Sequence, residues 1–232
     1  MVSKELIEKA RRLHGHICPF LVLGLRMSEM AMERLGVSRA GVVETIEEEL
    51  IAVVEVNNCL VDGVQIATGC TFGNNSLIYL DLGKNAVVLF RRGRSRGIRV
   101  YIDSEKLRQK YFPEEAIKLF QKVVVERKGS KEEVEKLHIL WEEIGYRMAE
   151  IPREEFVIQD VELIEDIEKA PIFKSVRCSK CGELVMETKA LNIDGQILCY
   201  ACSGLAIDAV IGRGIHKLRS IPYGIVGINA TQ

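Results

Sequence analysis

Two histidines and a cysteine crowd into the segment LHGHICPF, residues 13–20, which contains His14, His16 and Cys18. Imidazole nitrogen and thiolate sulfur are ligands of zinc and related metals, and a thiolate is also a nucleophile. In an extended segment, a spacing of two places all three side chains on one side. The alternative is three ordinary buried residues at a helix entrance. We favour a metal or catalytic site, because residues of ligand type rarely crowd so closely by chance.

Two further cysteines of the N-terminal half also lie beside polar residues, Cys59 in NNCLVDG and Cys70 in ATGCTFGNN. A helix entering at Cys59 would place Asp62 about one turn further along the same face. A helix starting at Pro19 would have Cys18 at its N-terminus, where the helix dipole lowers the pKa of a thiol. Local spacing does not show whether Cys59 meets Cys18. For Cys70, a small buried hydrophobe is an equally good interpretation.

The other four cysteines form a more specific pattern. Cys178 and Cys181 in CSKC are followed, after seventeen residues, by Cys199 and Cys202 in CYAC. Each Cys-x-x-Cys turn aims two sulfurs at one metal, and two such turns complete a tetrahedron. The pattern predicts a closed, structural zinc site. A rubredoxin-like iron site has the same spacing, and zinc is favoured only because it is commoner.

The segment between these cysteine pairs predicts a small zinc module. ALNIDGQILC reads as a β-hairpin that turns at Asp194-Gly195, and YACSGLAIDAVI reads as the start of a helix at the second pair. The order of turn, hairpin, turn and helix is typical of a treble-clef or ribbon-like module. Since so short a segment has little core of its own, the metal is expected to contribute to its folding.

The elements around the N-terminal residues predict an α+β domain, with an antiparallel sheet packed against helices, over residues 1–168. The helices are expected at residues 3–15, 19–36, 58–69, 104–127 with a break near Pro113, and 131–151. The strands are expected at residues 49–57, at two apolar runs that form a hairpin around DLGKN within residues 76–92, and at residues 97–104 and 156–165. Residues 169–232 are assigned to the zinc-finger domain and a C-terminal tail.

Composition excludes some classes of function. The 232 residues are 47% hydrophobic and 28% charged, with a formal net charge of -1, which argues against a protein that coats nucleic acid. No apolar run approaches the ~20 residues of a membrane-spanning helix, and the N-terminal segment MVSKELIEKARRL lacks the apolar stretch of a secretory signal. A cytoplasmic protein is expected, in which seven cysteines favour metal ligands or reactive thiols over disulfides.

Two other features have ordinary structural explanations. The segment RRGRSRGIR, residues 91–99, could bind an anion, but a solvated hairpin rim is the better interpretation. Trp141 and His138 lie in the helix predicted at residues 131–151; core packing explains Trp141, and His138 needs no role.

Three motifs, HGHICP, CLVDGVQ and TGCT, occur in this order and closely resemble the E-subunit family of formylmethanofuran dehydrogenase. The resemblance covers about residues 10–150, and many members of that family also carry a C-terminal zinc finger. It implies an α+β core, an intertwined homodimer and a cleft that contains the histidines and cysteines. Transferred to this chain, it implies a core metal, expected to be zinc, with His14, His16, Cys18 and Cys59 as candidate ligands. Cys18, Cys59 and Asp62 are the candidate catalytic residues, with Gln65 and Cys70 close by.

The same resemblance limits the expected activity. The parent complex reduces carbon dioxide onto methanofuran with molybdenum or tungsten, a pterin and iron-sulfur clusters. This sequence has no four-cysteine ferredoxin run and no recognisable pterin-binding domain. An accessory subunit or a stand-alone relative is therefore the first hypothesis, and other dehydrogenase subunits are its possible partners.

Two alternatives stay open. The second hypothesis is a hydrolase or group-transfer enzyme that uses the core cysteine and histidine site. The third is a regulatory or metal-sensing protein that acts through its zinc finger on protein or nucleic acid. Against the third, the few cations within the finger, Arg177, Lys180 and Lys189, are offset by acidic residues.

Overall fold

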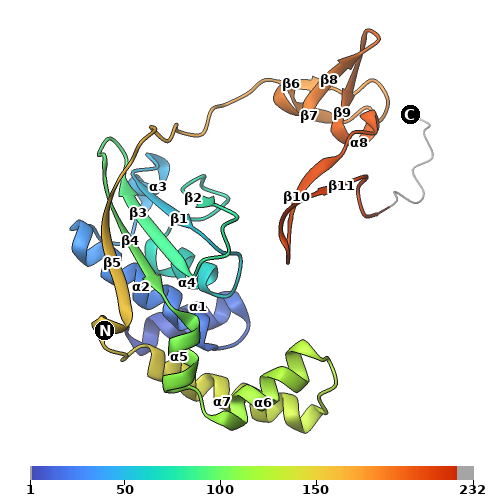
Figure 1. The fold of residues 1–232 in the computed structure, drawn as a ribbon. Helices are drawn as coiled ribbons and strands as arrows, with labels where there is room; N and C mark the ends of the chain where they lie inside the picture. The colour runs from blue at the N-terminus through green and yellow to red at the C-terminus, as the bar shows by residue number, and fades with distance from the viewer. Residues whose placement is uncertain (1, 224–232) are drawn as a thin grey trace. The chain divides into compact units, whose positions relative to one another are not determined.

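The computed structural model describes residues 2–223, and the rest of the C-terminal tail lies outside the described residues. The chain divides into two compact units, the first ending at Lys169 and the second starting at Ala170. We call them the core domain and the finger domain. Figure 1 labels their helices and strands. In the part of the chain that the structure describes, no helix combines the length and the apolar character needed to cross a bilayer.

The core domain contains one five-stranded sheet with the order β2-β1-β3-β4-β5. Its strands are β1 (Leu50–Val54), β2 (Leu77–Tyr79), β3 (Ala86–Arg91), β4 (Arg96–Ile102) and β5 (Phe156–Glu162). Adjacent strands are antiparallel except β1 and β2, which are parallel. The α+β class predicted from the sequence is confirmed, with this one parallel pair added to the expected antiparallel sheet.

The predicted hairpin around DLGKN is wrong. β2 and β3 do not pair with each other, because β1 lies between them and pairs with both. All five residues of β1 are buried, so this strand has its best place inside the sheet, where neighbours cover both edges. The DLGKN loop crosses the end of β1 and is held there by hydrogen bonds from the backbone N–H groups of Leu80 and Lys84 to Val54 and Glu55.

Helices cover one face of this sheet. The principal ones are α1 (Lys4–His14), α2 (Pro19–Leu35), α4 (Leu60–Thr68) and α7 (Lys131–Met148). α2 packs on β3 and β4 and also contacts α4 and α7, so it lies at the centre of the core. Because side chains alternate along a strand, the opposite face carries a separate, smaller cluster. That cluster consists of Ile51, Val53, Val88 and Phe90, against which Leu163 and Ile167 pack.

Shorter helices complete the core domain. They are α3 (Val42–Ile46), α5 (Ser104–Tyr111), α6 (Glu114–Phe120), the π-helix η1 (Gln121–Val125) and the 3-10 turn η2 (Arg153–Glu155). The break predicted near Pro113 separates α5 from α6, since Pro113 lacks a backbone N–H and restricts the conformation of Phe112. Together α5, α6, η1 and α7 form a helical extension of the core domain (Figure 1).

The finger domain is built from short hairpins. Its elements are β6 (Ser175–Arg177), β7 (Leu184–Met186), the 3-10 turn η3 (Glu187–Lys189), β8 (Ala190–Ile193), β9 (Gln196–Cys199), α8 (Tyr200–Ser203), β10 (Ile207–Ile211) and β11 (Gly214–Leu218). β8 and β9 form the predicted hairpin, and Asp194 and Gly195 both have the positive φ angles that such a tight turn requires. A helix begins at the second cysteine pair as predicted, but it ends at Gly204, in a left-handed conformation, and β10 follows.

Candidate metal centres

The core centre forms where the N-termini of α2 and α4 meet. Cys18 is the N-cap residue of α2 and Cys59 is that of α4. The two helices cross at Gly24 and Gly63, which lie so close that a Cβ atom on Gly24 would be 3.1 Å from the Cα of Gly63. No residue with a side chain fits at this crossing. The close packing brings together two cysteines that are 41 positions apart in the sequence.

The two histidines complete a compact cluster with Cys18. α1 ends at Gly15, whose φ of 90° reverses the chain and leaves His14 and His16 with ring centroids 4.6 Å apart. His14 Nε2 lies 3.8 Å from Cys18 Sγ. One potential ligand atom from each of His14, His16 and Cys18 lies within 4.8 Å of the others. Cys18 itself is only 3% exposed.

Cys59 joins this cluster through hydrogen bonds to Cys18 and His14. The hydrogen bond from Cys18, followed by the proximity of His14, lowers the pKa of the Cys59 thiol to about 6 against the opposing effect of burial. The same hydrogen bond, together with burial, raises the pKa of Cys18, although the backbone N–H groups at the start of α2 act in the opposite direction. The lowered pKa expected for Cys18 is therefore wrong for the metal-free pair, in which Cys59 is the thiolate.

Asp62 acts on this cluster through His14. Its Oδ2 lies 2.7 Å from His14 Nδ1, and its Oδ1 accepts a hydrogen bond of 3.1 Å from Gln65 Nε2. With a proton on Nδ1, the lone pair of His14 is on Nε2, which faces Cys18. A carboxylate that fixes the tautomer of a histidine in this way is the usual partner of a metal-ligating imidazole. Asp62, predicted as a catalytic residue, has the geometry of a positioning residue.

Sequence reasoning missed the contribution of α7. The indole of Trp141 stacks on His16, with centroids 6.0 Å apart and planes 20° apart, and the ring of His138 lies 6.4 Å from His16. Burial, followed by the proximity of His14 and His138, lowers the pKa of His16, so its imidazole is neutral at pH 7. Their spacing of three places His138 and Trp141 on one face of α7. Nothing local in the sequence shows that this face meets His16.

An apolar cavity of about 230 Å³ adjoins the two thiols. Cys18 and Cys59 line it on one side, and α5, α6, η1 and α7 supply the remaining wall. Five of its lining side chains are apolar and large: Phe20, Phe112, Ile117, Phe120 and Trp141. A buried thiol pair that borders a cavity is accessible to a small molecule, whereas a pair closed within a packed core is not.

Cys70 takes a different place. Its buried thiol donates a hydrogen bond of 3.3 Å to the backbone oxygen of Leu50, at the start of β1. Burial raises the pKa of Cys70 to about 11, so it is a neutral thiol within the hydrophobic core. This is the structural role that the sequence left open for it.

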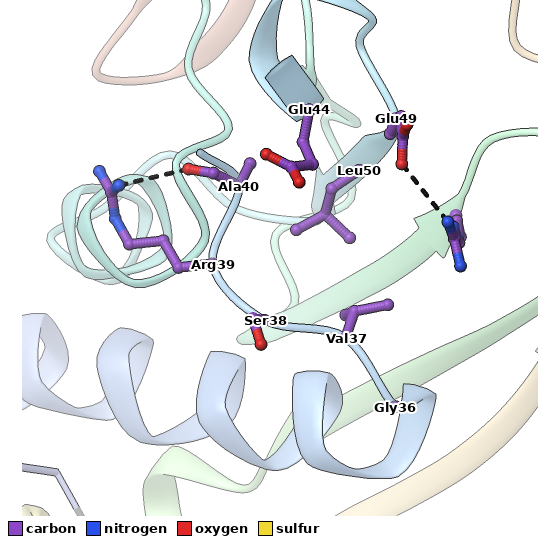
Figure 2. A pocket seen from close by; sticks show the side chains of 9 residues that line it. Gly36, Val37, Ser38, Arg39, Ala40, Glu44, Glu49 and Leu50 are labelled. Atoms are coloured by element: carbon purple, nitrogen blue, oxygen red, sulfur yellow. Dashed lines mark hydrogen bonds and ion pairs between the residues drawn. The ribbon is translucent and has the colours of Figure 1, made fainter. Parts of the chain in front are cut away.

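A second pocket, of about 250 Å³, lies between the end of α2, α3 and β1 (Figure 2). Its charged side chains already have partners within the chain. Arg39 donates to the backbone oxygens of Ile66 and Ala40, Arg91 pairs with Glu49 at 3.5 Å, and Glu44 accepts from the N–H of Gly41. The pocket therefore offers less reactive chemistry than the thiol cavity.

The arginine-rich segment 91–99 is largely neutralised in the same way. Arg92 pairs with Glu48, Arg96 with Asp160 and Arg99 with Glu55. These ion pairs agree with the interpretation as a solvated hairpin rim.

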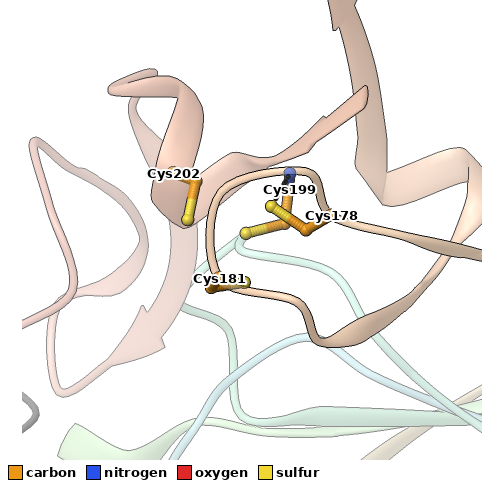
Figure 3. Close-up of side chains that lie close together, drawn as sticks. All are labelled: Cys178, Cys181, Cys199 and Cys202. Carbon is orange, nitrogen blue, oxygen red and sulfur yellow. Dashed lines mark hydrogen bonds between the residues drawn. The ribbon is translucent and has the colours of Figure 1, made fainter. Parts of the chain in front are cut away.

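The finger centre brings all four cysteines together, and Figure 3 shows their sulfurs converging. The four sulfur atoms lie within 4.8 Å of one another. Gly182, at φ 75°, closes the first turn with a hydrogen bond from its N–H to the backbone oxygen of Cys178. Backbone N–H groups of Cys181 and Cys199 lower the pKa of Cys178 to about 6, which favours the thiolate that a metal requires.

A two-domain protein with a cysteine-histidine centre in an α+β core and a four-cysteine zinc finger is the class that this geometry defines. Residues 13–158 match the family described as "FmdE, Molybdenum formylmethanofuran dehydrogenase operon", and the chain belongs to this family. Residues 171–204 match the "Prokaryotic dksA/traR C4-type zinc finger". The resemblance inferred from the three motifs and the finger is confirmed.

Two known proteins are similar to this chain. An FmdE-like protein of tungsten formylmethanofuran dehydrogenase from Syntrophus aciditrophicus, known from a crystal structure, is 26% identical, with a TM-score of 0.57, over 87% of this chain and 91% of that one. A protein of Archaeoglobus fulgidus named "Probable S-adenosyl-L-methionine-binding protein" is 54% identical over 213 residues. The match covers 92% of this chain but only 56% of the length of that relative.

Replacing Asp62 with asparagine is expected to weaken metal binding at the core centre by roughly 10- to 100-fold, because the partner that orients His14 loses its charge. Competition with a chromogenic chelator measures this affinity. Gln65→Glu, which alters the other neighbour of Asp62 and keeps the carboxylate on His14, is the comparison. Equal affinities for the wild type and Asp62→Asn would contradict the positioning role.

Proposed function

We propose that the core centre binds one divalent metal ion through His14, His16, Cys18 and Cys59, with zinc the preferred ion. The protein would then be a metal-binding accessory subunit, or a stand-alone relative, of formylmethanofuran dehydrogenase, in which the finger carries a second, structural zinc. The observation that carries the proposal is the convergence of these side chains beside a cavity.

The donor set fits zinc. Two thiolates and two imidazoles form a common tetrahedral set for this ion. From typical bond lengths to zinc, an imidazole nitrogen and a thiolate sulfur of one tetrahedron lie about 3.6 Å apart. His14 Nε2 and Cys18 Sγ are 3.8 Å apart, close to that value. A bound ion would supply Lewis acidity to the site.

A second candidate function is catalysis of hydrolysis or group transfer at the same centre. The observation in its favour is that Cys18 and Cys59 line an accessible cavity, whereas the four finger cysteines only converge on one another. In this function His14 and His16 would hold the metal, Asp62 would orient His14, and one thiol would be available to substrate. S-adenosylmethionine, which the name of the Archaeoglobus relative mentions, is not assigned to this chain, because 44% of that relative lies outside the match.

Elemental analysis of purified protein tests the proposal. We expect about two divalent ions per chain for the wild type and about one for Cys18→Ala. Cys70→Ala also removes a buried thiol from the core domain, but one outside the cluster, and should keep about two. A count near one in the wild type, or no loss in Cys18→Ala, would contradict the core metal site. Thermal unfolding of each variant separates loss of metal from loss of fold.

The partners inferred from the family resemblance remain predictions. A homodimer and association with other dehydrogenase subunits belong to the proposed accessory role, and light scattering of the purified chain measures the first of these.

A further inference from the structure

The cavity beside the core thiols has an amphipathic wall. Its apolar part consists of Phe112, Ile117, Phe120 and Trp141, on α5 to α7, and Phe120 remains 37% exposed. Aromatic rings that stay exposed at the rim of a cavity offer a surface on which another ring can stack. An apolar cavity of about 150 Å³ already accommodates benzene, so the volume of about 230 Å³ leaves room for a ring with a short substituent.

A single cation stands at the edge of this apolar wall. Arg108, on α5, lines the cavity, and the guanidinium forms no ion pair or hydrogen bond within residues 2–223. The other arginines and lysines near α5 differ in this respect: Lys110 pairs with Glu155, and Arg147 donates to the backbone oxygen of Tyr111. A guanidinium beside an apolar cavity is suited to receive the carboxylate of a ligand whose body fills that cavity.

The backbone next to the cavity is also irregular. Phe120 ends α6 and Gln121 begins the π-helix η1, and both side chains line the cavity. The N–H of Glu126 bonds to the carbonyl oxygen of Gln121, five residues earlier, as a π-helix requires. Short π-helical segments within α-helices occur frequently at functional sites. This distortion is independent evidence that the wall is shaped for a ligand.

We infer that the cavity binds a small arylcarboxylate, whose ring lies among Phe112, Phe120 and Trp141 and whose carboxylate pairs with Arg108. The inference rests on the proposed function, since Cys18 and Cys59 of the core centre form the inner wall of the cavity. A ligand held in this way lies against the two thiols. It identifies the class of molecule on which the core centre acts or which it carries.

The protein provides its own reporter, because Trp141 is its one tryptophan and lines the cavity. The probes are 3-phenylpropionate and its neutral counterpart 3-phenylpropan-1-ol, titrated against the wild type, Arg108→Gln and Lys106→Gln. Lys106 is an exposed cation on the same helix, 82% exposed at its side chain, and is absent from the cavity wall. The metal content of each sample is measured in parallel.

We expect a saturable change of Trp141 fluorescence with the acid and weaker binding of the alcohol. Arg108→Gln should lower the affinity for the acid by about tenfold and leave that for the alcohol unchanged, because only the charge-assisted bond is lost. Lys106→Gln should match the wild type. Equal affinity of Arg108→Gln and the wild type for the acid, or the absence of saturation with both probes, would overturn the inference.

The parallel metal count separates the two proposals. Two ions per chain without saturable binding would reject the carboxylate inference and leave the core metal intact. One ion per chain, with binding that depends on Arg108, would reject the core metal and support the cavity as a separate carboxylate site.

Discussion

Cys181→Ser is expected to remove the finger metal and to unfold the finger domain while the core domain stays folded. The physical reason is the near absence of a hydrophobic core. Among the described residues after Lys169, Cys178 is the one buried hydrophobic side chain, and apolar residues such as Leu184 and Leu205 are 63% and 50% exposed. A structural zinc ion contributes roughly 10–16 kcal/mol to the folding of small domains of this kind. Three two-stranded sheets cannot replace that contribution.

Limited proteolysis combined with elemental analysis measures this effect. In Cys181→Ser, trypsin should cleave rapidly at finger residues such as Lys180 and Lys189, and the count should fall by about one ion per chain. Ser179→Ala, within the same turn but without a ligand atom, should behave as the wild type. A Cys181→Ser protein that keeps its metal and resists trypsin would show that the finger folds by other means. A chelator added to the wild type should reproduce the cleavage pattern.

The finger could be predicted from sequence because all its determinants are local. The spacing of each cysteine pair fixes the turn geometry, and the Asp194-Gly195 turn fixes the hairpin register. The length of α8 was less accessible. The apolar run after Gly204 is compatible with either a helix or a strand, and pairing with β11 decides for the strand.

The core centre could be predicted only in part. His14, His16 and Cys18 are neighbours in sequence, so their types and spacing indicate a site. The meeting of Cys18 with Cys59 depends on the crossing of α2 and α4, which is a tertiary contact. The approach of Trp141 and the cavity wall depend on the packing of α7 on α2, more than 100 residues apart. Periodicity predicts that these helices exist and leaves their mutual placement undetermined.

The place of β1 illustrates the same limit. The apolar runs on either side of DLGKN have hairpin chemistry, and a loop of this kind normally joins adjacent strands. The structure inserts β1 between them, because its buried residues pack on both faces of the sheet. Long-range burial therefore outweighs the local turn preference.

Gly63→Ala is expected to destabilise the core domain by about 3 kcal/mol or more and to abolish metal binding at the core centre. A Cβ atom at Gly63 would overlap the backbone oxygen of Leu21 and would lie 2.8 Å from the backbone N of Leu25. Both obstacles are backbone atoms of α2, so no side-chain rotation relieves the clash. The helices would have to separate, and Cys59 would move away from Cys18.

Denaturant unfolding of Gly63→Ala and Gly73→Ala measures the destabilisation. Gly73 has no atom nearer than 4.0 Å to an added Cβ, and its φ is not in the left-handed region, so alanine there should cost less than about 0.5 kcal/mol. Gly24→Ala, which clashes with the backbone of Leu60 on the other side of the crossing, should match Gly63→Ala. Since Gly24 and Gly63 contribute no ligand atom, loss of the core metal in either variant would show that the helix crossing builds the centre. Wild-type stability and an unchanged metal count in both would place the origin of the centre elsewhere.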